Sequence, residues 1–541
     1  MLGIEQKKNY VIHYHNQTKH YPNRFASAPG FLEWDTQPNP FRFYRGAEKI
    51  GLPFRKDVKE IPYLNIYKNK INPTKDFNLQ NLGIFLEYAL GLSAWKSIPG
   101  ATWSLRINPS SGNLHPTEGY LVLPDLPDLK SGIYHYSPYL HSLERRALLT
   151  SSLKEKLFEF FQGEGFVVGL SSIYWRESWK YGERAYRYCH LDLGHALACI
   201  RMSANLLGWN VTCLNQFSHE DVDEILGLRQ MQQIPAEIEE GDILCLVHHS
   251  KDFHSFDSFS YEILEEFRKL DFSGVPNQLS GEHVDWEIIN IVASNCKKDR
   301  TASTPQVSPD YPPMKDYPKN SSSAHIIIKG RRSALAMDGE TSITKDQFLS
   351  MLDKTLPRSD AIPFDLELCE PKIHLVLFVH RVEGLDQGVY IFVRNPDDFK
   401  LLRTKLNPEY SWGQVEEDFP LYQLAKADVR SVAAAISCGQ AIAGDSAFSL
   451  AMLANFEKSV HVDPTCYPVL YWESGIIGQV LYLEAEAHGV RSTGIGCFFD
   501  DPVHEYIGLK DNSFQSMYHF TVGGAVDDVR LQTLRPYHHL K

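Results

Sequence analysis

The sequence predicts an α+β protein built from two similar halves. Each half is expected to be a mixed, mainly antiparallel sheet flanked by helices, and the halves to pack as an intramolecular pseudo-dimer. Three observations predict this fold: a length of 541 residues, an internal repeat, and strand-like runs that recur in both halves. The length suits about two to four domains, and 43% apolar with 22% charged residues is typical of a globular chain. The repeat favours one domain written twice.

A change in composition between about residues 271 and 324 predicts a linker. Within it, DRTASTPQVSPDYPPMKDYPKNSSSA is rich in Pro, Ser and charge and has no helical or strand period. We therefore expect an N-terminal extension (1–60), a first domain (61–270), the linker (271–324) and a second domain (325–541). Below, the first half is the chain before this linker and the second half is the chain after it.

The repeat lies near the end of each half. DLGHALACIRMSANLLGWNVTCLNQFSHEDVDEILGL aligns without a gap with ESGIIGQVLYLEAEAHGVRSTGIGCFFDDPVHEYIGL, so that Gly194 matches Gly475 and Gly208 matches Gly489. Apolar residues recur three or four positions apart until a glycine ends the run, which predicts a helix. A short extended segment and a second short helix (HEDVDEILGL, DDPVHEYIGL) follow in both copies.

Strand-like runs fill the rest of each half. They are GYLVLPD, SGIYHYSP and ILCLVHH in the first half, and IHLVLFVH, QGVYIFVR and MYHFTVGG in the second. The segment 437–456 (SCGQAIAGDSAFSLAMLANF) predicts a helix rich in small residues. Sheets with flanking helices in both halves give the α+β class.

Charge and composition exclude several classes of function. A formal net charge of −13 argues against nucleic acid or an anionic membrane as the main partner. The sequence has no uncharged apolar window of membrane-helix length, and its first residues lack a signal-peptide core, so a cytoplasmic location is expected. Nine cysteines without a CxxC pair predict neither a disulfide framework nor a zinc cluster, and no metal site is expected.

Three segments carry groups suited to a ligand. RINPSSGNLHPTEGY (106–120) contains a tight turn of hydroxyl, amide and N–H groups that can bind a planar polar ligand, or it is an ordinary surface loop. Arg331, Arg332 and Ser333 precede a helix that begins at Thr344; they suit a phosphate, or form a solvated basic patch. Gly494-Ile495-Gly496 allows close approach of a flat ligand but is not a dinucleotide-binding fingerprint.

These segments carry a family resemblance. PSSGNLHPTE, followed by SGIYHYSPYLHSLERR and ESWKYGERAYRYCHLDLGH, resembles the SagB-type (thiazole/oxazole) dehydrogenases of the nitroreductase superfamily. RRS before a helix, and GIGCFFDDPVHEYIGL before FTVGG, resemble the N- and C-terminal nitroreductase motifs. The resemblance implies FMN as the prosthetic group. It also implies an intertwined dimer in which residues of both subunits hold each flavin.

The two halves keep complementary parts of that flavin site. In the first half, Cys-Leu-Asn (213–215) stands in place of the GIG segment and Asn-Ile-Tyr (65–67) in place of Arg-Arg-Ser. The second half has LPRSDAIPFDLEL in place of PSSGNLHPTE. We therefore expect one composite FMN site per chain. Its expected residues are Arg331, Arg332 and Arg530 at the phosphate, Ser333 at the phosphate or ribityl chain, Gly494, Ile495 and Gly496 at the ring, and Pro109, Ser110, Ser111 and Asn113 closing over it.

Lys180 and Tyr181 match the Lys-Tyr pair that is catalytic in azoline-oxidising relatives. A lysine held away from water beside a flavin can act as a base, with the tyrosine as hydrogen-bond donor. The alternative is that Lys180 begins a surface helix and Tyr181 packs beneath it. His115 and Glu118 either face the substrate or fix the turn.

The leading function is an FMN-dependent dehydrogenase that oxidises a small heterocycle or a peptide-derived azoline. Two alternatives remain: an NAD(P)H-dependent nitro, quinone or ene reductase, and a flavin-binding protein without turnover. The expected partners are a small molecule or peptide substrate, and NAD(P)H in the reductase alternative. The fused halves predict a pseudo-dimeric monomer, with further dimerisation left open.

Overall fold

The computed structural model of the chain describes residues 3–55, 60–69, 71–161, 163, 165–231, 233–250, 259–302, 308–315, 317, 322–366 and 368–540. Two seven-stranded sheets dominate it, one in each half, and every described pairing within them is antiparallel. The predicted α+β class is confirmed. Parallel pairing among the described strands is confined to the small β12–β14 ladder (Ile343–Thr344 with Val382–Glu383) and an isolated bridge.

The two large sheets have the same strand order, as expected for a duplicated domain. In the first half the order is β2 (Glu48–Gly51), β7 (Ser142–Leu148), β6 (Gly132–Ser137), β5 (Thr117–Leu123), β8 (Phe166–Ile173), β10 (Glu239–His248), β9 (Asn210–Cys213). In the second half it is β16 (Gly413–Glu416), β17 (Phe419–Lys426), β15 (Gly388–Phe392), β13 (Ile373–Val379), β18 (Phe448–Ala454), β20 (Gln515–Gly523), β19 (Arg491–Ile495). Each of the six predicted strand runs forms one of these strands.

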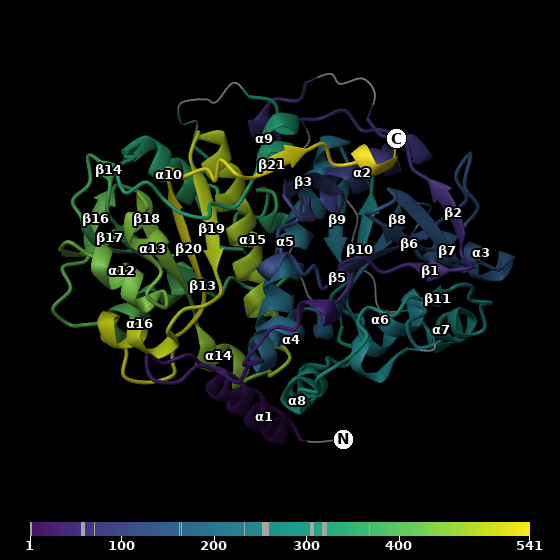
Figure 1. Cartoon of the computed structure of the whole chain (residues 1–541), viewed down its shortest axis with the longest axis horizontal. Coiled ribbons are helices and arrows are strands. Elements are labelled where there is room, and N and C mark those ends of the chain that lie inside the picture. Colours follow the sequence, from purple (N-terminus) through teal and green to yellow (C-terminus); the bar gives the residue numbers. More distant parts are fainter. Residues whose placement is uncertain are drawn as a thin grey trace.

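The central helices confirm the repeat. Helix α5 (Ala185–Leu206) and helix α15 (Cys466–Ala487) both have 22 residues, and the short helices α6 (His219–Leu226) and α16 (Asp500–Ile507) both have eight. All four keep the alignment of the sequence repeat. Figure 1 shows α5 and α15 side by side between the two sheets. They form the interface of the two halves.

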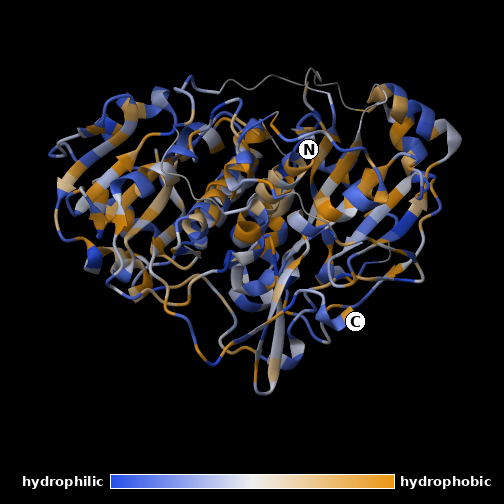
Figure 2. Ribbon diagram, turned by 90° about the horizontal axis from the view of Figure 1, so that it is seen from above, coloured by the Kyte–Doolittle hydropathy of each residue, from blue (hydrophilic) through white to orange (hydrophobic). Residues whose placement is uncertain are grey.

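Other helices pack beside the central helices or cover the opposite faces of the sheets. In the first half they are α2 (Leu79–Ala89), α3 (Ser151–Phe160), α4 (Tyr174–Tyr181) and α7 (Tyr261–Arg268); in the second half they are α10 (Lys345–Asp353), α11 (Phe399–Lys405), α12 (Arg430–Ile436), α13 (Ala441–Asp445) and α14 (Phe456–Val460). Helices α2 and α4 pack against α5, and α10 packs against α15. Helix α10 begins as predicted at Thr344, which forms a reciprocal capping box with Gln347. Figure 2 shows the hydrophobic residues concentrated in the sheets and along the central helices.

Both terminal segments join the two halves. The N-terminal helix α1 (Ile4–Gln17) lies at the lower edge of the interface in Figure 1, and the two ring nitrogens of His15 lie 3.2 Å from Tyr467 Oη and 3.1 Å from Gln515 Oε1. At the other end, strand β21 (Gln532–Leu534) leaves the second half and pairs with β3 (Leu92–Ile98), which pairs with β4 (Ala101–Arg106). The halves are therefore intertwined as well as packed.

Two segments differ from what their composition suggests. The predicted helix at 437–456 is wrong: its first part forms α13 and its second part forms β18, which sits inside the sheet between β13 and β20. The predicted linker (271–324) includes the short strand β11 (Val275–Pro276) and helix α8 (Glu287–Cys296), and helix α9 (Ala324–Gly330) begins at its end. Within it, residues 303–307, 316 and 318–321 lie outside the described residues. The domain boundaries remain a prediction.

The helices of the described part of the chain include none with both the length and the apolar character needed to span a membrane.

Candidate active site

A cavity of about 890 Å³ lies between the two halves and takes its walls from both. The first half supplies the turn 109–113, and the second half supplies 330–335, the strand segment 493–497 and part of the C-terminal segment 526–533. The cavity therefore brings together most of the predicted site residues: Pro109, Ser110, Ser111, Asn113, His115, Tyr181, Arg331, Arg332, Ser333, Gly494, Ile495 and Gly496.

The turn of the first half has an unusual backbone. Gly112, Asn113 and His115 have φ values of 58°, 62° and 54°, in the left-handed region that side chains disfavour. The Asn113 amide donates to the carbonyl of Ser104 at 2.9 Å, and Asn113 Oδ1 lies 3.0 Å from His115 Nε2. These bonds hold the turn in a conformation that projects it into the cavity.

A buried pair of carboxyl groups supports the same turn. The backbone N–H of Ser111 donates to Asp192 Oδ1 at 3.0 Å, its hydroxyl donates to the same atom at 3.2 Å, and the Ser110 hydroxyl donates to Glu177 Oε1 at 3.4 Å. Burial raises the pKa of Asp192 to about 7, although the serine hydrogen bonds oppose it. Burial and the nearby Asp192 also raise the pKa of Glu177. The pair is therefore poised to hold a proton beneath the turn near neutral pH.

Arg331 and Arg332 form the cationic end of the cavity. Their guanidinium groups donate to backbone carbonyls: Arg331 to Arg106 at 3.2 Å, and Arg332 to Lys329 at 2.9 Å. Among the described residues neither forms an ion pair, and the Nε of Arg331 is buried without a hydrogen-bond partner. Burial first, then Arg331, lowers the pKa of Arg332 to about 10, so it stays charged at neutral pH.

Further positive charge gathers at the same end. Lys96 and Arg491 also line the cavity. Burial and the neighbouring Arg332 and Arg491 lower the pKa of Lys96, which is the effect expected of like charges held close together. Arg491 forms an ion pair with Asp527. An anionic group placed between these side chains would relieve their mutual repulsion.

Two tyrosine side chains occupy the space that side chains at positions 494 and 496 of the GIG segment would need. A Cβ atom on Gly494 would lie 1.7 Å from Tyr518 Oη, and one on Gly496 would lie 2.5 Å from the Tyr188 ring. Tyr482 lies between this segment and the Arg-Arg-Ser segment, because its Oη accepts from the Gly494 N–H at 3.0 Å and lies 2.9 Å from Ser333 Oγ. The glycines therefore let aromatic rings reach the cavity wall.

Lys180 and Tyr181 end helix α4 behind the turn. A Cβ atom on Gly112 would lie 2.7 Å from Tyr181 Oη and 3.2 Å from Lys180 Nζ, so glycine at this position makes room for both groups. Lys180 Nζ lies 5.3 Å from the centre of the Tyr181 ring. Burial raises the pKa of Tyr181 well above its ordinary value, so its hydroxyl remains a donor. Tyr181 lines the cavity, whereas Lys180 lies against Gly112 and is not among the lining residues.

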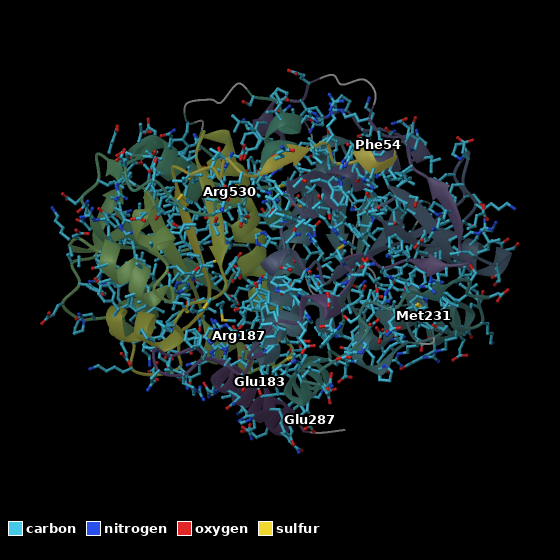
Figure 3. All side chains as sticks on the ribbon, viewed as in Figure 1. Phe54, Glu183, Arg187, Met231, Glu287 and Arg530 are labelled. Carbon is cyan, nitrogen blue, oxygen red and sulfur yellow. The ribbon has the colours of Figure 1, made fainter. Side chains whose placement is uncertain are left out.

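Besides Lys180, two predicted residues lie away from the cavity wall. Glu118 is buried in the first sheet, where Arg176 donates to its Oε1 at 2.5 Å and His135 Nε2 lies 3.0 Å from its Oε2. It fixes the turn's base and does not face the cavity. Arg530, labelled in Figure 3, has an 82% exposed side chain that donates to Asp528 and is not among the lining residues.

His115 does line the cavity. Burial, and then the charge of Arg106, lower its pKa well below the ordinary value, so the ring is neutral. Its Nδ1 is buried and has no hydrogen-bond partner among the described residues. This atom is free to bond with a ligand.

Several lining residues were missed from the sequence. Tyr188, Asp192 and His195 lie on one face of α5, four and then three positions apart. That spacing was a signal available in the sequence, although the same helix carries other polar residues such as Arg187, His190 and Arg201. Tyr482, Arg491 and Tyr518 carried no comparable signal, because their elements reach the cavity only through tertiary packing.

A second cavity of about 820 Å³ lies at the corresponding place on the other side of the interface. Its wall includes the predicted substitute Cys213-Leu214-Asn215 and residues of the segment 356–368. Arg201 occupies the position equivalent to Tyr482, and its guanidinium pairs with Asp365 at 2.6 Å. This second cavity has no counterpart of the Arg331–Arg332 pair among the residues that line it.

Comparison with known proteins agrees with this architecture. Residues 94–237 match the model of the nitroreductase family. A stretch of 129 residues is 28% identical to a protein of Methanocaldococcus jannaschii that is named as a nitroreductase, covering 23% of this chain and 64% of that protein. Another 129-residue match, 30% identical, is to the trifolitoxin-processing protein TfxB of Rhizobium leguminosarum bv. trifolii, covering 22% and 35%. The matches thus span less than two thirds of either relative.

The fold comparison covers nearly the whole chain. A crystal structure from Anabaena variabilis, described as a nitroreductase, superposes with a TM-score of 0.69 at 23% identity over 96% of this chain and 99% of that one. At this identity the similarity establishes the fold. The chain therefore has the fold of that structure, and residues 94–237 are similar to the nitroreductase family. More particularly, it carries that fold in a tandem arrangement, and part of the chain is similar to a protein named as trifolitoxin-processing.

Proposed function

We propose that this protein is an FMN-dependent oxidoreductase that binds one FMN per chain in the cavity between its halves. The single observation that carries the proposal is the cluster of Arg331, Arg332 and Lys96 at one end of that cavity, where the two arginines have no carboxylate paired with them among the described residues. Such a cluster suits a phosphate group, because each guanidinium offers a planar set of donors.

The rest of the cavity fits the remaining parts of FMN. Ser333 offers a hydroxyl beside the cationic end, and the Gly494–Gly496 segment lines the cavity with the rings of Tyr188 and Tyr518 packed against it. The unpartnered Nδ1 of His115 and the turn 109–113 supply polar groups on the opposite wall. The bound flavin would supply hydride transfer.

The chain's own contribution to chemistry is the Lys180–Tyr181 pair. We assign Lys180 Nζ as the base that takes a proton from substrate carbon, and Tyr181 Oη as the donor that orients the substrate. The buried Asp192 and Glu177 hold the turn, and through it Gly112, against these two groups. The substrate class we propose is a small heterocycle or a peptide-derived azoline. The similarity to the trifolitoxin-processing protein supports a peptide-derived substrate.

Reduction of a nitroaromatic, quinone or enone by NAD(P)H is the second candidate. The match of residues 94–237 to the nitroreductase family favours it. A third reading, a flavin-binding protein without turnover, draws on the loss of motif residues at the second cavity.

The test begins with the flavin count of the purified chain. We expect one FMN per chain after saturation; two or none would contradict the composite site. The flavoprotein is then offered an azoline with oxygen, and separately NADPH with a nitroaromatic. Oxidation of the azoline alone supports the dehydrogenase, turnover of the nitroaromatic alone supports the reductase, and no reduction of the bound flavin by either donor supports the binding protein.

A further inference from the structure

The sulfur atoms of Cys438 and Cys497 lie 2.8 Å apart, although the two residues belong to different elements. Cys438 follows helix α12, and Cys497 follows strand β19. The separation is less than an ångström longer than the bond of a disulfide, about 2.05 Å. Both residues are reduced and partly exposed.

Backbone and side-chain hydrogen bonds hold the two loops in this position. The N–H of Phe499 donates to the carbonyl of Ile436 at 2.8 Å, and the Gln440 amide donates to the carbonyl of Cys497 at 2.9 Å. Cys438 itself has a φ of 55°, in the left-handed region. This disfavoured conformation turns its side chain toward Cys497 and is held by the contacts on either side.

Cys497 is the more reactive of the two thiols. The hydrogen bond with Cys438, and then His20 and Arg184, lower its pKa to about 5, so the thiolate is present at neutral pH. The Arg184 guanidinium also donates to the neighbouring carbonyl of Gly496 at 3.3 Å. By contrast, burial raises the pKa of other cysteine thiols in the chain, at Cys189, Cys199, Cys296, Cys369 and Cys466.

Cys497 is also reachable, because it lines the cavity described above. The pair Cys213 and Cys245 provides a comparison within the same chain. Their sulfurs lie 3.6 Å apart on neighbouring strands β9 and β10, but both residues are buried. Both pairs are close, and Cys213 also lies in a cavity wall, that of the second cavity, whereas partial exposure and an activated thiolate are found at Cys497.

We propose that Cys438 and Cys497 form a redox-active dithiol that hydrogen peroxide entering the cavity converts into a disulfide. The Cys497 thiolate attacks one peroxide oxygen; an S–O bond forms, the O–O bond breaks, and the departing oxygen leaves as water after taking a proton. The Cys438 sulfur then attacks the sulfenic sulfur, the S–O bond breaks, and a second water carries away the thiol proton. The two sulfurs lose two electrons in total and the peroxide gains them.

The test uses the purified full-length protein with its bound groups in place. The protein is treated with hydrogen peroxide, its remaining thiols are blocked with N-ethylmaleimide after unfolding, and its peptides are analysed by mass spectrometry. We expect a cross-linked peptide joining Cys438 to Cys497, lighter by two hydrogen atoms than the dithiol and reversed by dithiothreitol. The Cys213–Cys245 pair should remain fully blocked by the reagent. Full blocking of Cys438 and Cys497 after peroxide would overturn the proposal.

Two variants test the order of events. In Cys438→Ser, peroxide should leave a sulfenic acid on Cys497 that dimedone captures. In Cys497→Ser, Cys438 should stay unmodified under the same treatment; labelling of Cys438 at the rate of Cys497 would overturn the assignment of the attacking thiol. These readouts need neither turnover nor a flavin, so their outcome is independent of the proposed function. The wild-type cross-link decides the matter even where a variant fails to fold.

Discussion

A Cβ atom built on Gly475 would lie 2.9 Å from the Cα atom of Gly194. These two residues are equivalent in the repeat, and they meet where α5 and α15 cross at the interface. Each lies against backbone of the opposite helix: Gly475 faces the carbonyl of Leu191, and Gly194 faces that of Trp472. The closest approach of the two halves therefore depends on the absence of a side chain at both positions.

Substitution at this crossing should destabilise the protein. In Gly475→Ala the new methyl group would lie 2.2 Å from the Leu191 carbonyl, which is backbone and cannot rotate away. We expect a loss of about 1–3 kcal/mol in the free energy of unfolding, measured by urea denaturation. Gly281→Ala is the control, since its Cβ would meet nothing within 4 Å. Equal stability of both variants would contradict the close approach.

The cationic end of the cavity predicts which arginines bind FMN. Arg332→Gln should weaken FMN binding about 10- to 100-fold, because it removes a charge-assisted contact in a partly buried site. Arg530→Gln should change it less than about twofold, because that side chain is exposed and pairs with Asp528. Quenching of FMN fluorescence during titration of the apoprotein measures both. The opposite ranking would place the phosphate at Arg530, which the sequence predicts at the phosphate together with Arg331 and Arg332.

The raised pKa of Asp192 predicts a pH-dependent stability. Its pKa is about 7 in the folded protein against an ordinary 3.8, so between these values the folded state binds more protons than the unfolded state. Stability from this group therefore falls as pH rises from about 4 to about 7. Asp192→Asn removes this ionisation, so we expect the variant to have a larger free energy of unfolding than the wild type. The difference between the two should grow as pH rises over this range and exceed about 1 kcal/mol at pH 8.

Urea denaturation at a series of pH values measures this difference. Asp528→Asn is the control: hydrogen bonds from Arg530 lower the pKa of the half-buried Asp528 to about 2, so its effect should be constant between pH 5 and pH 8. A difference for Asp192→Asn that does not change with pH would show that its carboxyl ionises normally.

The role proposed for Lys180 predicts that its substitution lowers the rate of turnover without changing flavin binding. Lys180→Met should lower turnover by about 100-fold or more, while leaving the FMN count unchanged because the side chain is not among those that line the cavity. Lys510→Met, at an exposed position, is the control. A rate within about twofold of the wild type would refute the role of Lys180 as base.

The sequence predicted those parts of the fold that local pattern determines. The offset between Gly194 and Gly475 located α5 and α15, and the six alternating or apolar runs each became a strand. The segment 437–456 was misassigned because small apolar residues are compatible with helix and strand alike, and pairing of β18 with its two neighbours decided the outcome. Such pairing is a tertiary effect that the local composition does not contain.

The sequence predicted the site residues that belong to a motif in either half. It missed the residues that only tertiary packing brings to the cavity. The turn 109–113 and Arg331–Ser333 were found from sequence and meet in one cavity. The approach of Cys438 to Cys497 depends on two loops that meet only in the folded state, so no spacing rule could find it. The sequence assigned Arg530 to the phosphate because it matches the basic residue after the last strand of the family. In the structure its guanidinium donates to Asp528, and the side chain is exposed to solvent.

The pairing of β21 with β3 has a consequence for the order of folding. Gln532 lies opposite Ser97, more than four hundred positions away along the chain, and this ladder carries the segment 526–533 across the cavity rim. Contacts between such distant positions carry the largest loop-closure cost and form slowly. On a ribosome, both sheets would emerge before the strand that closes the rim. The ligand cavity is thus the last feature to be completed, and a nascent chain that lacks β21 would still have an open binding site.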